Sequence, residues 1–187
     1  MSEVKQEFIL DPQPIKDGDR LCIIDAGPSK TSLEIALDCS LVTGFLDKQP
    51  TGACVVFVPY GCLYQAGALL NLKPKSIVVT ATPKSVKLGY VFSESANPVK
   101  RKVFHDHHSG TRSSACVRYL IEKLTNPGDG VIDMQANKMA LPAMWCRRLG
   151  RQYVGCALSQ EELSVMRAKL SQIELPATQM EIPECQS

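Results

Sequence analysis

The three histidines of this chain lie close together and, with a neighbouring aspartate, have the residue types of a metal site. They occur in the run His105-Asp106-His107-His108. Imidazole and carboxylate groups are common zinc ligands. Neighbouring residues of an extended segment point to opposite faces, so these four side chains would converge only in a special loop. We therefore expect a polar surface loop here and no metal site.

A second group of polar residues could bind phosphates. These residues are basic and stand in or beside the same part of the chain: Lys84, Lys87, Lys100, Arg101, Lys102 and Arg112, with Arg118 a little further on. If they share one surface, they form a basic patch that would attract DNA or RNA. An ordinary solvated face explains them equally well. The net charge of +2 does not decide between the two, because a local patch can exist in a nearly neutral chain.

Apolar runs and helical periodicities alternate along the chain, and they must position any such site. Short apolar runs bounded by glycine, proline or polar residues predict strands at 21–25, 53–58, 76–82 and 88–93. Apolar residues at helical spacing predict helices at 32–45, 60–72, 113–124 and 161–173. Continuous apolar strands are typical of a sheet that is buried on both faces. The alternation predicts a three-layer α/β domain with a mostly parallel central sheet.

The size and composition of the chain fit one intracellular domain. Its 187 residues can bury a sizeable core, and 44% hydrophobic with 21% charged residues is ordinary for a globular protein. We place the domain at 19–173, between an extended arm (1–18) and a loose tail (174–187). No apolar run approaches a membrane span, and the first residues lack a signal core. The cysteines include no Cys-x-x-Cys pair, so we expect buried free thiols.

The stretch from Asn126 to Leu158 predicts a strand, a helix and a second strand. An Asn-Pro-Gly-Asp turn at 126–129 precedes an apolar strand that ends at Asp133. An apolar helix follows and ends near Gly150, and the second strand begins at Gln152. Such a βαβ unit joins two parallel strands of one sheet.

This unit and the segment before it resemble the DNA amino-methyltransferases of the N6-adenine/N4-cytosine type in their permuted motif order. In that family a His-Pro-Thr-Gln-Lys-Pro-like segment opens the helix before the cofactor strand. Here the run from His108 to Ser113 takes that place and keeps the histidine, and the turn at 126–129 matches as well. The resemblance covers residues 20 to 173 and implies a Rossmann-like, S-adenosylmethionine-dependent methyltransferase fold.

The positions that the resemblance assigns to cofactor binding depart from the family pattern. They are Asp133, Met134, Gln135, Ala136, Asn137, Met139 and Ala157, together with His108. The family has Asp-Pro-Phe-x-Gly-Ser-Gly from the first of these positions, and its glycines let the backbone turn tightly and approach the cofactor. Met139 brings a long side chain to that loop. Ala157 has no acceptor for the ribose hydroxyls, which an acidic residue binds in the family.

The catalytic loop of the family departs in the same way. Its Asp-Pro-Pro-Tyr segment holds the target amino group and stacks the flipped base on its aromatic ring. The corresponding residues here are Asp25, Ala26, Gly27 and Pro28. The aspartate is present and the aromatic residue is not.

These departures favour the interpretation that the chain keeps the methyltransferase fold but has lost methyl-transfer activity. On this hypothesis the chain is a catalytically inactive interaction or scaffolding subunit, with no cofactor expected. It would pair with a protein such as an active methyltransferase or a larger complex, and DNA or RNA could bind its basic patch. The alternative is a divergent but active S-adenosylmethionine-dependent DNA or RNA N-methyltransferase, using Asp25 and Asp133. A third interpretation is a different nucleotide-binding or small-molecule-binding α/β protein.

Overall fold

The computed structural model describes residues 6–9, 19–25, 32–62, 66–93, 99–107, 113–136, 140–157 and 159–172. The strands of this part of the chain are β1 (Gln6–Ile9), β2 (Asp19–Ile24), β3 (Ala53–Pro59), β4 (Ser76–Thr82), β5 (Ser85–Ser93), β6 (Lys102–His105), β7 (Gly130–Ala136) and β8 (Gln152–Ala157). Its helices are α1 (Ser32–Lys48), α2 (Gly67–Asn71), α3 (Ser114–Leu124), α4 (Leu141–Leu149) and α5 (Gln160–Ser171), with a 3-10 turn at Tyr60–Cys62. No helix among the described residues is both long and apolar enough to cross a membrane.

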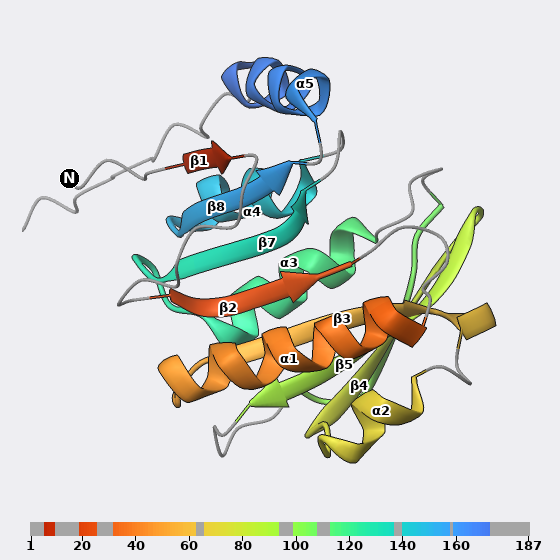
Figure 1. Cartoon of the computed structure of the whole chain (residues 1–187). Helices are drawn as coiled ribbons and strands as arrows, with labels where there is room; N and C mark the ends of the chain where they lie inside the picture. Colours follow the sequence, from red (N-terminus) through yellow and green to blue (C-terminus); the bar gives the residue numbers. More distant parts are fainter. Residues whose placement is uncertain are drawn as a thin grey trace, which may run out of the picture.

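The eight strands form one mostly parallel sheet in the order β1-β8-β7-β2-β3-β5-β4-β6 (Figure 1). The first five strands of this order, from β1 to β3, are parallel to one another. The hairpin of β4 and β5 supplies the antiparallel pairs, and β6 joins β4 in parallel. The predicted βαβ unit is present, because β7 and β8 are parallel neighbours joined through α4.

Each face of the sheet carries its own hydrophobic core, which gives the three layers. Along β2, Leu21 and Ile23 enter the core shared with α3, α4 and α5. Cys22 and Ile24 enter the core shared with α1 and α2. Figure 1 shows α1 and α2 in front of the sheet and α3 and α4 behind it. The predicted three-layer α/β architecture is therefore confirmed.

Three elements differ from the prediction made from the sequence. Residues 6–9 of the predicted arm form β1, and part of the polar stretch before α3 forms β6. Both are edge strands that join the sheet through backbone hydrogen bonds, which demand no apolar pattern. A single helix over 60–72 is also wrong in its bounds, because the described residues there form a 3-10 turn and the short α2.

The ends of α3 and α4 meet at a buried arginine. Arg151 is 8% exposed, and its guanidinium donates to the Thr125 carbonyl at 2.9 Å and to the Thr125 hydroxyl at 3.1 Å. It also donates to the Leu149 carbonyl at the end of α4. Gly150 ends that helix with a φ of 69°, a conformation that favours glycine. The arginine thus binds carbonyl groups that the two helix ends leave without a helical partner.

Candidate functional site

The two aspartates predicted to take part in the site lie on neighbouring parallel strands. Asp25 follows β2 directly, and Asp133 lies in β7 opposite Ile23 in the register. Side chains alternate along a strand, so both aspartates point to the face covered by α3 and α4. The carboxyl ends of the parallel strands β2, β7 and β8 lie at the same end of the sheet. Ligands bind at this end in open α/β sheets. The structure thus brings the predicted aspartates to this end.

Asp25 forms a buried ion pair with Lys87. The Lys87 Nζ lies 2.6 Å from Oδ1 of Asp25, and both side chains are 2% exposed. Lys87 lies in β5 opposite Pro59, so its side chain reaches past β3 to the end of β2. Isolated charges at such depth would cost several kcal/mol each, and the pair offsets this cost. Asp25 is therefore a carboxylate that is already bound by a cation.

The prediction that Lys87 belongs to a basic surface patch is wrong. Its side chain lies on the same face of β5 as that of Val91, which belongs to the core shared with α3 and α4. The counter-charge comes from a residue 62 positions earlier in the chain. A lysine is almost never fully buried unless it is paired, and this long-range partner was not visible in the sequence.

Asp133 is also buried and is bound by Tyr153. Its exposed fraction is 0%, and the Tyr153 hydroxyl donates to Oδ2 of Asp133 at 3.3 Å. Asp133 pairs with Gly155 across β7 and β8, and Tyr153 stands two residues before that glycine on the same face. A Cβ on Gly155 would lie 2.8 Å from ring carbons of Tyr153 and closer still to its hydroxyl. The glycine leaves the space through which the tyrosine reaches the aspartate.

The thiol beside Asp133 does not provide a nucleophile. Burial raises the pKa of Cys146 far above its ordinary value, and the negative charge of Asp133 raises it further, while Arg151 opposes the shift. Burial has the same effect on the pKa of Cys116 in α3. Both groups therefore stay protonated at neutral pH. The cysteines of the described residues are free thiols, and most are buried, as expected from the sequence.

The other predicted cofactor and catalytic positions are only partly described. Met134 follows Asp133 in β7 but packs against the core on the α1 face, so these two side chains do not converge. Gln135 and Ala136 end β7, and Ala136 pairs with Ala157 of β8. The remaining predicted positions lie outside the described residues: Ala26, Gly27, Pro28, His108, Arg112, Asn137 and Met139.

The other basic residues of the predicted patch that the structure describes are exposed. Lys84 lies in the turn between β4 and β5, whereas Lys100, Arg101 and Lys102 lie at and just before β6. The nearby Asp106 accepts a hydrogen bond from the Ser114 backbone at 2.9 Å, which helps to begin α3. Within the described part of the chain, no three potential metal ligands come together.

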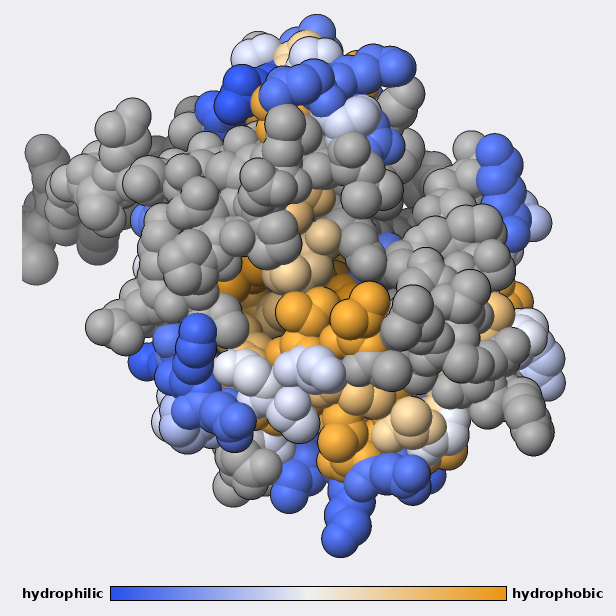
Figure 2. Space-filling view, viewed as in Figure 1, coloured by the Kyte–Doolittle hydropathy of each residue, from blue (hydrophilic) through white to orange (hydrophobic). Residues whose placement is uncertain are grey.

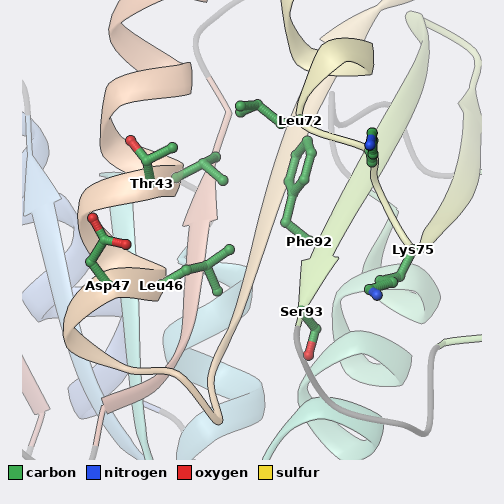
Figure 3. A pocket seen from close by; sticks show the side chains of 9 residues that line it. Thr43, Leu46, Asp47, Leu72, Lys75, Phe92 and Ser93 are labelled. Carbon is green, nitrogen blue, oxygen red and sulfur yellow. The ribbon is translucent and has the colours of Figure 1, made fainter.

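A pocket of about 230 Å³ lies at the opposite edge of the sheet (Figure 3). It is lined by residues of α1, the segment after α2 and the end of β5: Val42, Thr43, Leu46, Asp47, Leu72, Lys73, Lys75, Phe92 and Ser93. Ser93 pairs with Ala53, the first residue of β3, so this is the amino edge of the parallel strands. The pocket contains none of the predicted site residues.

No protein-family profile matches this sequence, and no curated protein matches it either. Solved structures do match it. TTHA0409 of Thermus thermophilus, a candidate DNA modification methylase complexed with S-adenosyl-L-methionine, aligns with a TM-score of 0.63 and 13% identity over 93% of this chain and 96% of that chain. The M1.HpyAVI complex with SAM gives 0.61 and 17% identity over 81% and 88%.

The cytosine-N4-specific PvuII DNA methyltransferase aligns with a TM-score of 0.58 and 12% identity, over 84% of this chain and 82% of that chain. At identities this low, the structural alignments show a common fold and nothing beyond it. The chain therefore has the Rossmann-like fold of S-adenosylmethionine-dependent methyltransferases, as the resemblance of its motifs implied.

Replacing Gly155 with alanine should lower the free energy of unfolding by about 1 to 3 kcal/mol. The added methyl group would overlap the Tyr153 ring, which is 1% exposed and has little room to move. The matched control is Gly67→Ala, where no atom lies within 4 Å of the added Cβ. Denaturant unfolding of both variants checks this. Equal stability of the two would contradict the close approach.

Replacing Lys87 with methionine should lower the free energy of unfolding by about 3 to 5 kcal/mol, because it leaves Asp25 buried beside an apolar side chain. The double variant Asp25→Asn/Lys87→Met removes both charges and should regain much of that loss. Denaturant unfolding of the two single variants and the double variant gives the coupling energy. Additive effects of the two substitutions would show that the ion pair is not a stabilising unit.

Proposed function

We propose that this chain is a degenerate methyltransferase of the N6-adenine/N4-cytosine type that no longer transfers methyl groups and serves as an interaction subunit. The observation that carries this proposal is the buried ion pair of Asp25 and Lys87. Asp25 stands where the resemblance places the aspartate that would hold the target amino group. Here that carboxylate instead binds Lys87 of β5 in the protein interior.

The ion pair leaves a substrate little to gain at Asp25. A base amino group is a neutral donor, and a neutral hydrogen bond is about half as strong as one from an ammonium. Asp25 is only 2% exposed, so the amino group would have to enter a buried site and compete there with the Lys87 ammonium, which lies 2.6 Å from Oδ1. Displacing the ammonium would leave a buried charge without its partner, which costs several kcal/mol.

The cofactor side of the site supports the same proposal. Asp133 is buried and bonded to Tyr153, so its described contact ties β7 to β8. Asn137 and Met139 stand where the family pattern has glycines, and Ala157 stands where it has an acidic residue. These substitutions remove the close backbone approach and the ribose acceptor on which cofactor binding relies. We therefore expect no S-adenosylmethionine bound to this chain.

An exposed apolar surface on α1 supports a protein partner. Leu37 and Leu41 are 56% and 39% exposed and lie one helical turn apart. Val42 and Phe45 of the same helix are buried, so α1 carries apolar residues on both its inner and its outer side. Figure 2 shows apolar side chains gathered on the face of the molecule that α1 covers. Contiguous exposed apolar surface of this kind is typical of protein interaction sites.

A divergent active methyltransferase is the second candidate. Two of the solved structures that match this chain contain S-adenosylmethionine, and Asp25 and Asp133 stand on neighbouring strands at the edge where a ligand would bind. On this alternative, Asp25 would act on the target amino group and Asp25→Asn would abolish methyl transfer.

Titration calorimetry with S-adenosylmethionine and S-adenosylhomocysteine separates the two candidates. We expect no heat of binding up to millimolar ligand, because the glycines and the ribose acceptor of the family pattern are missing. An active methyltransferase of the same fold, titrated in parallel, is the positive control. Micromolar affinity would overturn the proposal, and methyl-transfer assays on DNA and RNA would then test the alternative.

The double variant Leu37→Ser/Leu41→Ser should lose the partner protein that co-purifies with the wild-type chain from its native source. The substitutions remove exposed apolar side chains and leave the core of α1 in place. The matched control is Val86→Ser/Val103→Ser, which removes apolar side chains that are 43% and 53% exposed on other elements. Quantitative mass spectrometry compares the three samples. Equal recovery of the partner with both variants would exclude α1 as the docking surface.

A further inference from the structure

Several cations on the α3 and α4 side of the sheet lie over aromatic rings. The Lys102 ammonium at the start of β6 lies 5.1 Å from the centre of the Phe104 ring and 4.9 Å from that of Tyr119. These two rings are themselves 5.3 Å apart, so β6 and α3 are in contact here. Cations within about 6 Å of a ring centre are attracted to its π-face. These contacts restrict the conformations of the Lys102 side chain and keep its ammonium against the protein surface.

Two arginines are held in the same way by Trp145 of α4. The guanidinium carbons of Arg118 and Arg148 each lie 5.2 Å from this ring, one coming from α3 and the other from α4. The ring is fixed because its Nε1 donates to the Ser114 hydroxyl at 3.0 Å. A guanidinium that stacks on a ring keeps its N–H groups in its own plane, where they can donate to phosphate oxygens.

These cations lie on elements that their aromatic contacts join, with Lys102 of β6 on Tyr119 of α3 and Arg118 of α3 on Trp145 of α4. The aromatic contacts therefore link β6 to α3 and α3 to α4. The segments 99–107, 113–124 and 140–149 carry the basic residues Lys100, Arg101, Lys102, Arg118, Lys123, Arg147 and Arg148. Their acidic residues are Asp106, which caps α3, and Glu122, which pairs with Arg118. Cations therefore outnumber acids strongly here, although the whole chain carries only +2.

We propose that this β6–α3–α4 surface binds the phosphate backbone of nucleic acid without reading its sequence. A strongly cationic surface complements a polyanion, and cations held on aromatic rings lose less freedom when phosphates bind them. Phosphate contacts carry no sequence information, so affinity should depend on salt more than on sequence. The surface lies on the opposite side of the sheet from α1 (Figure 1), and the proposal holds whether or not the chain transfers methyl groups.

Fluorescence anisotropy with a labelled DNA duplex of about 20 base pairs tests this proposal. The affinity is measured at several salt concentrations, and the slope of log affinity against log salt falls by about one for each phosphate-binding cation that is removed. The double variant Lys102→Gln/Arg148→Gln should bind about tenfold more weakly than the wild type, with a salt slope lower by about two. The matched control is Lys73→Gln/Lys75→Gln, which removes the same charge from exposed lysines beside α2. It should bind like the wild type.

Three outcomes would overturn the proposal. They are no binding of the wild type at low salt, equal weakening by the two double variants, and strong preference for one of two duplexes of scrambled sequence. Thermal unfolding midpoints within a few degrees of the wild type would show that the variants are folded. An RNA duplex of equal length shows which nucleic acid binds more tightly. The S-adenosylmethionine titration does not enter this test, so the two proposals can fail separately.

Discussion

The ion pair of Asp25 and Lys87 joins the parallel half of the sheet to its antiparallel hairpin. Lys87 comes from β5 and Asp25 from the end of β2, with β3 between them. Each charge is buried to 2% exposure, so each depends on the other for its place in the interior. The end of β2, which the resemblance assigns to the catalytic loop, is thereby part of the core. A substrate that bound Asp25 would have to enter this buried site and compete there with the Lys87 ammonium.

A second buried polar pair lies on the same face of the sheet. Tyr153 and Asp133 join β8 to β7, as Lys87 and Asp25 join β5 to β2. Asp133 lies opposite a glycine, because the tyrosine needs the space that a side chain on Gly155 would fill. Buried polar groups are tolerated when they are satisfied, and a shift of strand register would separate both pairs. These residues therefore specify how the strands of this sheet align.

Much of this fold could be predicted from the sequence, because the strands that carry both cores are uninterrupted apolar runs. The βαβ unit was predictable from the turn at 126–129 and from the glycine that ends α4. The edge strands β1 and β6 were not, since backbone pairing alone holds them. The burial of Lys87 was missed because its partner is distant in sequence. The contact of Tyr153 with Asp133 was missed too, although a glycine two residues after a buried tyrosine is a signal for it.

The residues that match the family pattern and those that depart from it have different physical roles here. Asp25 and Asp133 match, and both carry buried bonds between strands, so losing either would destabilise the sheet. The glycines, the ribose acid and the aromatic residue of the catalytic loop serve the cofactor and the base, and these are the positions that depart. A sequence constrained by folding alone would show this division. On the proposed function, the chain acts through the two faces of the molecule, and the second group of residues is then free to depart from the family pattern.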